Sequence, residues 1–267
     1  MSKYFSFFKL RFFINLQYKV AALSGIITQF AWGFMQVMIF KSLYNSNAER
    51  FPMSLLATNS YIWLQQAFLP FFMFWFIENE TFETISNGNI AYELCRPIDI
   101  YNIWFINNLA NRTTKALLRC WPVLLTALFL PDPYGLMLPN NFLTFLFFVI
   151  SSILSIIVTV SLCMFAYIIT FYTLSPLGIK TLFLSLIEFF SGAIIPLPFF
   201  PNKFQKITEF LPFASMQNVP FRIYVGNIVG ISIFKALALQ LIWILILIYF
   251  GKKLCENVMR KIVLQGG

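Results

Sequence analysis

The chain has 267 residues, of which 59% are hydrophobic and 11% are charged, and its formal net charge is +9. A soluble domain normally carries about 25% charged residues, so this composition excludes an ordinary soluble protein and indicates that lipid contacts most of the surface. The chain has no histidine, which excludes Ser-His catalysis and histidine-ligated metal sites.

The first half of the chain predicts an interfacial helix and three membrane spans. Residues 1–19 are basic and rich in Phe, which favours a helix lying at the cytoplasmic membrane interface. A span needs roughly 20 apolar residues, and the first two such runs are residues 20–43 and 52–77. The third predicted span, residues 103–130, is a long helix whose cytoplasmic half is polar and which Pro122 is expected to kink.

The second half predicts three more spans and an outer hairpin. A Pro-Asp-Pro-Tyr-Gly turn at residues 131–135 precedes the fourth predicted span, residues 142–172. The fifth predicted span, residues 179–195, runs into a proline-rich stretch whose apolar groups are too short to cross a membrane. We predict a re-entrant or interfacial helical hairpin there, on the outer face. The sixth predicted span is residues 228–250.

The distribution of basic residues predicts the orientation of these spans. Placing both termini in the cytoplasm puts 13 Lys and Arg residues in inner segments and 5 in outer segments. The positive charge therefore indicates membrane orientation and anionic lipid headgroups rather than nucleic acid. The predicted fold is one all-α, polytopic transmembrane domain over residues 1–267.

The segment between the second and third predicted spans is longer than a connection requires and lies on the cytoplasmic side. Asn-Gly-Asn at residues 87–89 breaks it, and Ile90, Tyr92 and Leu94 follow as apolar groups on a short helix that ends before Pro97. Such a helix suits docking into a groove on a soluble partner. The alternative is an interfacial helix that binds only lipid headgroups.

Two stretches of this sequence resemble type-2 ABC permeases. Residues 88–97 read Gly-Asn-Ile-Ala-Tyr-Glu-Leu-Cys-Arg-Pro, and this family has a glycine and an aliphatic residue before a Leu-x-Arg-Pro ending. Residues 191–201 read Ser-Gly-Ala-Ile-Ile-Pro-Leu-Pro-Phe-Phe-Pro and resemble the end of the family's fifth span. Residues 211–213, Pro220 and residues 224–226 continue the similarity.

This resemblance implies a bacterial plasma-membrane protein with six spans that dimerises with a second permease subunit and rests on cytosolic ABC ATPases. It also implies that the segment after residue 87 is the coupling helix seated on the ATPase. The residues it assigns to that contact are Gly88, Ile90, Tyr92, Glu93, Leu94, Arg96 and Pro97. The chain departs from the pattern in having Glu93 and Cys95 beside Leu94, where apolar neighbours are expected.

The sequence has no phosphate-binding loop of the form G-x-x-x-x-G-K-[ST], so we predict no ATP site and no enzyme activity on this chain. ATP and Mg are expected on the partner ATPase. The predicted function is the permease subunit of an exporter that moves an amphiphilic substrate, peptide or drug by alternating access. The alternatives are an ion-gradient-driven secondary transporter and a membrane assembly factor that does not transport.

A few residues are candidates for the substrate path: Glu188, Pro196, Pro198 and Lys235. A charge at mid-membrane is costly, so Glu188 faces protein or water, either as a lining group or as a carboxyl bonded to a neighbouring helix. Lys235 either pairs with it or extends to the outer headgroups. The polar residues 107–119 either line an inner vestibule, contact the ATPase or form a solvated helix extension. The four cysteines share no metal-binding spacing and are expected to pack as small apolar residues.

Overall fold

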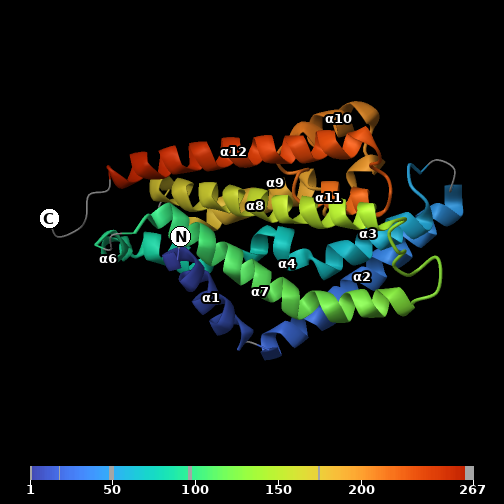
Figure 1. Cartoon of the computed structure of the whole chain (residues 1–267), viewed down its shortest axis with the longest axis horizontal. Helices are drawn as coiled ribbons and strands as arrows, with labels where there is room; N and C mark the ends of the chain where they lie inside the picture. Colours follow the sequence, from blue (N-terminus) through green and yellow to red (C-terminus); the bar gives the residue numbers. More distant parts are fainter. Residues whose placement is uncertain (1, 18, 48–50, 96–97, 174, 262–267) are drawn as a thin grey trace.

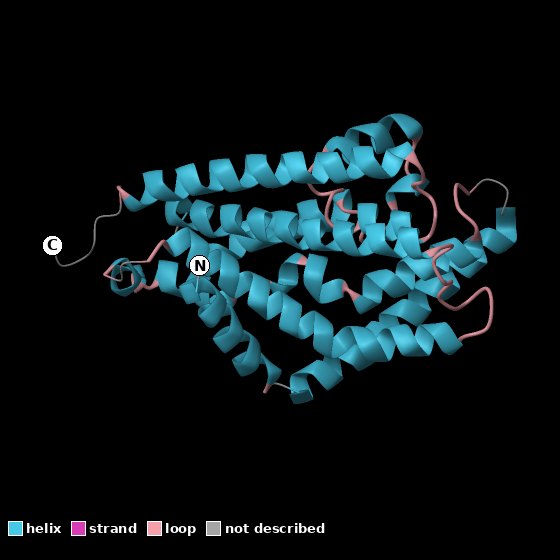
Figure 2. Cartoon of the chain, in the orientation of Figure 1, coloured by secondary structure: helices cyan, strands magenta, loops and turns pink. Residues whose placement is uncertain are grey.

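The computed structural model describes residues 2–17, 19–47, 51–95, 98–173 and 175–261, and these residues form helices and loops without a strand (Figure 1, Figure 2). The all-α prediction is therefore confirmed for the described residues. Three helical segments there are long and apolar enough to cross a membrane: Leu23–Ser46, Phe142–Thr173 and Ile231–Met259. The other three predicted spans do not meet these criteria, and their crossing of the bilayer stays a prediction.

The N-terminal helices pack around one long helix. Helix α1 (Ser2–Leu16) lies along α7 (Ile100–Phe129), and α2 (Lys19–Asn47) packs against both α7 and α3 (Leu55–Ala67). Helix α7 begins three residues before the predicted third span and contains Pro122, as expected. The polar cytoplasmic half predicted for this span therefore belongs to the same continuous helix as its apolar half.

Helices α8 (Phe142–Thr173) and α12 (Ile231–Met259) pack side by side over much of their length (Figure 1). A buried polar network joins them. The Gln240 amide nitrogen donates to Ser155 Oγ at 2.8 Å and to the Ser215 carbonyl at 3.0 Å, and Ser151 Oγ donates to Gln240 Oε1 at 3.0 Å. Such bonds hold helices together in lipid, where apolar burial supplies little driving force.

The second predicted span is not one continuous helix, which corrects the prediction for residues 52–77. After α3 the chain forms only α4 (Leu69–Phe72) and the 3-10 turn η2 (Phe74–Phe76). Met73 has an extended backbone with φ −76° and ψ 139°, so helical hydrogen bonding stops there. A break at membrane depth requires another donor for the released carbonyls, because lipid supplies none.

Arg112 of α7 supplies that donor. Its Nη1 donates to the backbone carbonyls of Pro70, Phe71 and Met73, at 3.2, 3.2 and 2.8 Å. Its Nε donates to Asn108 Oδ1 at 2.7 Å, and the side chain is 0% exposed. Arg112 therefore stabilises the broken segment from inside the bundle, instead of serving only as positive charge on a cytoplasmic helix surface.

Two short α-helices and a 3-10 turn follow α9 (Pro176–Phe190), where the hairpin was predicted. They are η3 (Leu197–Phe199), α10 (Asn202–Phe210) and α11 (Asn218–Tyr224). Helix α11 packs against α8 and α3, so this region joins the bundle. Whether the hairpin is re-entrant stays a prediction.

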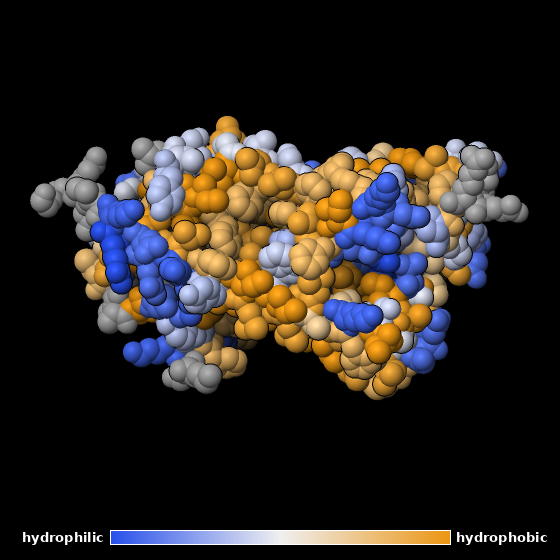
Figure 3. Space-filling model, turned by 90° about the horizontal axis from the view of Figure 1, so that it is seen from above, coloured by the Kyte–Doolittle hydropathy of each residue, from blue (hydrophilic) through white to orange (hydrophobic). Residues whose placement is uncertain are grey.

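The surface is apolar in the middle of the molecule. On the face that Figure 3 shows, hydrophobic residues cover the central region, and hydrophilic residues gather in two groups, one toward each end. This distribution is the one expected when lipid surrounds the middle of a helical bundle and water or headgroups surround its ends. Helices α5 (Asn79–Ser86) and α6 (Ile90–Leu94) lie at the end where α7 begins and α12 finishes (Figure 1).

Candidate functional site

The predicted docking segment forms two short helices joined by a glycine turn. Helix α5 ends at Ser86, the Asn87 N–H donates to the Glu83 carbonyl at 2.9 Å, and Gly88 has φ +71°. A residue with a side chain is strained in this left-handed conformation, which explains why glycine stands at the turn. The break predicted at residues 87–89 is therefore present, and a separate helix α6 follows it.

Helix α6 has one buried and one exposed face. Ile90 is 2% exposed and packs into the hydrophobic core of the bundle. Tyr92 and Leu94 are 75% and 36% exposed, so they form the apolar outer face of this helix. Of the residues assigned to docking, Ile90 anchors α6, whereas Tyr92 and Leu94 are accessible to a partner. Arg96 and Pro97 lie outside the described residues.

Glu93 holds α6 against α7. Its Oε2 accepts a hydrogen bond from Trp104 Nε1 at 2.9 Å, and Trp104 is buried against Tyr167 and Phe171. This bond gives a physical reason for the acidic residue that departs from the family's apolar pattern. Glu93 therefore positions the exposed face of α6.

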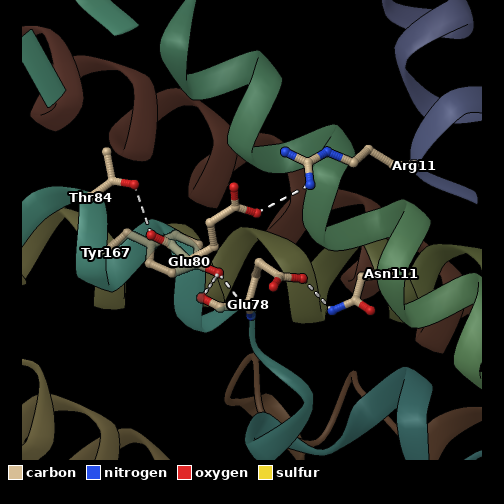
Figure 4. Close-up of polar contacts among 6 residues, drawn as sticks. All are labelled: Arg11, Glu78, Glu80, Thr84, Asn111 and Tyr167. Atoms are coloured by element: carbon tan, nitrogen blue, oxygen red, sulfur yellow. Dashed lines mark hydrogen bonds and ion pairs between the residues drawn. The ribbon is translucent and has the colours of Figure 1, made fainter. Parts of the chain in front are cut away.

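A second anchor lies at the start of α5 (Figure 4). Tyr167 Oη of α8 donates to the Glu78 carbonyl at 3.0 Å and accepts from the Glu78 N–H at 3.1 Å. Asn111 of α7 donates to Glu78 Oε2 at 2.6 Å. Burial raises the pKa of the Glu78 carboxyl, and the nearby Lys115 charge opposes that shift. The segment that leads to α6 is thus bonded to both α7 and α8.

Peripheral contacts add to this arrangement. Arg11 of α1 forms an ion pair with Glu80 at 3.1 Å (Figure 4), and Lys180 of α9 donates to Asn79 Oδ1 at 2.8 Å. The Arg11–Glu80 pair is partly exposed, so its contribution to stability is small, about 0–1 kcal/mol. These bonds nevertheless bring α1 and α9 into contact with α5.

The polar half of α7 lines a cavity beside α5, named the inner cavity after the predicted orientation. This inner cavity has a volume of about 400 Å³ and lies among α1, α5 and α7. Its polar lining comprises Arg11, Asn15, Glu78, Glu80, Asn107, Asn111, Lys115 and Arg119. One face of residues 107–119 therefore lines this polar cavity, while Asn108 and Arg112 on another face are buried in protein.

A second, central cavity lies among α2, α3, α7, η2 and α9, with a volume of about 500 Å³. Glu188 is one of its lining residues, and its role in a substrate path stays a prediction. Arg119 lines both the central and the inner cavity, so its side chain lies at the boundary between them.

The structure does not bring the remaining path candidates to Glu188. Lys235 lines a different cavity, together with Glu209 and Arg222 near the start of α12. Pro196 and Pro198 are buried in the segment that follows α9. Lys235 and Glu188 therefore line different cavities, and their pairing stays a prediction.

Sequence reasoning missed the central cavity's glutamines. They come from α2 and α3 and are Gln29, Gln36, Gln65 and Gln66. The available signal was the presence of amide side chains inside otherwise apolar runs, which is costly unless they meet a partner or water. The glutamine spacing along the chain alone does not show that two helices bring them together.

The cysteines have no shared site. Cys120, Cys163 and Cys255 are buried, Cys95 is exposed, and all are free thiols. Cys163 accepts a hydrogen bond from Arg112 Nη2 at 3.2 Å. Among the residues that the structure describes, no group of three His, Cys, Asp or Glu side chains is placed to hold a metal ion.

Comparison with known proteins gives one family. A family model described as ABC-2 family transporter protein matches residues 59–266, from within α3 to beyond the end of α12. The matched region includes α5, α6, α9 and the short helices that follow α9. No individual curated protein matches the chain.

Proposed function

The chain belongs to the ABC-2 transporter family, and from this membership we propose that it is the permease subunit of an ATP-driven exporter. The family match over residues 59–266 is the observation that carries the proposal. Membrane components of this family generally work with separate ABC ATPases. In this proposal two six-span permease subunits, each resting on a cytosolic ATPase, move an amphiphilic substrate, peptide or drug by alternating access.

The six proposed crossings are α2, the broken segment from α3 to η2, α7, α8, α9 and α12. This assignment is supported by the position of α6 at the same end of the bundle as the start of α7 and the finish of α12 (Figure 1). It places both termini in the cytoplasm and the short helices after α9 on the outer face. The two cavities then follow one another from the cytoplasmic end toward the middle of the bilayer.

Helix α6 is the proposed coupling helix. Its exposed Tyr92 and Leu94 offer an apolar face to a groove on the ATPase, as amphipathic helices do in other complexes. Glu93 and the backbone of Glu78 connect this face to α7 and α8 through hydrogen bonds. Movement of an ATPase groove would therefore act directly on two helices of the bundle.

The test compares one double variant of α6 with a control on α10. The tagged chain is purified from its native membrane, and co-purifying proteins with a phosphate-binding loop are quantified by mass spectrometry. We expect Tyr92→Asp with Leu94→Asp to abolish ATPase recovery. The control Ile207→Asp, which changes a similarly exposed apolar residue on α10, should leave recovery unchanged. Full ATPase recovery with the α6 variant would refute docking through this face.

An ion-gradient-driven secondary transporter is the second candidate function. The discontinuous segment from α3 to η2 favours it, because transporters of that class bind substrates and ions at broken helices. Only one carboxylate, Glu188, is among the lining residues of the central cavity, which is few for ion coupling. Transport in proteoliposomes that requires an ion gradient and no ATP would select this candidate. A non-transporting assembly factor would show neither activity.

A further inference from the structure

Gln29 is an unusual side chain in the central cavity. It is 3% exposed, yet neither its amide nitrogen nor its amide oxygen has a hydrogen-bond partner among the described residues. Gln29 is a lining residue of the cavity that also contains Glu188 and Arg119. Buried polar groups normally have partners, so an unsatisfied amide beside a cavity indicates a ligand that supplies them.

Three further glutamines extend this polar surface. Gln66 Nε2 donates to Gln36 Oε1 at 3.1 Å, and Gln65 Nε2 donates to the Ala193 carbonyl at 2.5 Å. An amide side chain has two donor hydrogens and an acceptor oxygen. After this bond is made, the Gln36 amide still has its N–H donors and the Gln66 amide still has its carbonyl oxygen as an acceptor.

The chemistry of these amides restricts the ligand. Gln29 requires both an acceptor for its NH₂ group and a donor for its oxygen. A peptide bond offers both at a short distance, whereas the esters of a phospholipid only accept. A set of glutamines from α2 and α3 thus matches a peptide backbone better than a lipid glycerol group.

Opposite charges flank the amides. Arg119 extends from α7 toward α2, where the absence of a side chain on Gly25 leaves room for its guanidinium, and it lies 5.3 Å from the Phe76 ring centre. Glu188 lines the cavity from α9. A ligand with a carboxylate and an ammonium group can pair with one each, and charge-assisted bonds are stronger than neutral ones.

The rest of the cavity is apolar and of limited size. Trp32, Trp75 and Leu69 contribute to its wall. Its volume of about 500 Å³ is in the range of small-ligand sites, roughly 300–1,000 Å³, so it accommodates a short ligand and not a folded protein. Apolar walls with a few fixed polar groups are typical of sites that orient an amphiphile.

We propose that the central cavity binds a short apolar peptide with free termini, with Gln29 bonded to its backbone, Arg119 to its carboxylate and Glu188 to its ammonium group. This inference rests on the proposed export function and specifies its substrate class. Entry from the inner cavity brings the carboxylate past Arg119, because that residue borders both spaces.

The test measures equilibrium binding of tritiated peptides to the full chain in lipid nanodiscs, without ATPase. The reference ligand is the tetrapeptide Leu-Phe-Leu-Phe with free termini. Three analogues each remove one feature: the C-terminal amide removes the carboxylate, the N-acetyl form removes the ammonium, and an ester analogue removes the central N–H donors. Each loss is expected to weaken binding about tenfold.

Matching each analogue with a variant separates ligand contact from folding. Arg119→Gln should weaken binding of the free-carboxylate peptide about tenfold and leave binding of the C-terminal amide unchanged. Glu188→Gln should weaken binding of the free-amine peptide about tenfold and leave binding of the N-acetyl form unchanged. Gln29→Leu should weaken the reference peptide more than the ester analogue, because the ester keeps a carbonyl acceptor for the Gln29 NH₂ group but has no N–H donor for its oxygen. The variant should not lower the melting temperature, because it removes an unsatisfied buried amide.

Gln205→Leu on α10 is the matched control, since Gln205 lies outside the central cavity, and it should bind every ligand as the wild type does. If each variant lost affinity equally for all four ligands, the proposal would be overturned. Binding of an alkyl glucoside with no binding of the peptides would also overturn it. The measurement needs no ATPase, so absence of peptide binding with ATPase co-purification intact refutes the substrate class alone. Peptide binding without any ATPase partner refutes the export function instead.

Discussion

Replacement of Arg112 by methionine keeps much of the side-chain volume but removes the guanidinium that binds the broken segment from α3 to η2. In the structure this guanidinium donates to the carbonyls of Pro70, Phe71 and Met73. Arg112 is 0% exposed, so water does not replace the lost donors unless the bundle opens. We therefore expect Arg112→Met to destabilise the fold, even though it removes a buried charge.

The magnitude follows from the carbonyls that lose a donor. The Met73 carbonyl also accepts from the Phe76 N–H at 3.4 Å and keeps that bond. The buried Asn108 Oδ1 also loses its donor, Arg112 Nε. At about 1.5 kcal/mol each, the Pro70 and Phe71 carbonyls and Asn108 Oδ1 give a destabilisation of about 4.5 kcal/mol. For a chain of this size, that corresponds to a decrease in melting temperature of about 9–18 °C.

The assay is thermal unfolding of the purified chain in detergent, followed by intrinsic fluorescence. Arg260→Met, at the exposed residue that follows α12, is the matched control and should melt within about 2 °C of the wild type. Arg112→Lys should be intermediate, because one ammonium group cannot reproduce the planar set of donors. A melting temperature for Arg112→Met equal to that of the control would refute the assignment of Arg112 as the stabilising donor.

Three further predictions concern the coupling segment and the cavities. Glu93→Ala removes the bond from Trp104 and should reduce ATPase co-purification several-fold with little change in melting temperature, which the same purification and a thermal scan measure. Gly25→Ala places a methyl group where the Arg119 guanidinium lies, so the flexible arginine must move; transport in proteoliposomes should slow while the melting temperature stays within about 2 °C. Burial raises the pKa of Glu78 above 4.5, so the folded state binds its proton more tightly than the unfolded state, and stability should fall as pH rises through that raised pKa. Melting curves from pH 4.5 to about 7 should show this decrease in melting temperature in the wild type and a smaller decrease in Glu78→Gln. An equal change of melting temperature with pH in the two proteins would contradict the assignment to Glu78.

Apolar runs predicted most of the long helices because the requirement to span lipid is local to each segment. The predicted fourth span, 142–172, and the helix Phe142–Thr173 differ by one residue at the C-terminal end. The short helix after Gly88 was predictable for a similar reason, since a glycine turn is encoded by adjacent residues. The family resemblance, drawn mainly from residues 88–97 and 191–201, agrees with the family match.

Local patterns could not predict the break in the second span. Residues 52–77 are apolar enough for one helix, and the break is stabilised by Arg112, which is far away in the sequence. The same limit applies to Ile90 and Glu93. Whether each faces a partner or the bundle depends on the position of α7 and α8, so one belongs to the core and the other bonds to Trp104.

By itself, the sequence indicated an all-helical membrane protein that resembles the ABC-2 family and has a helix break at Gly88. Composition, apolar run length and turn residues carry that information, because each acts within one segment of chain. The tertiary structure alone decided which polar residues meet inside the bundle. Gln29 and Gln65 lie on different helices, and Arg119 reaches their cavity from a third, so the site exists only when the helices are packed.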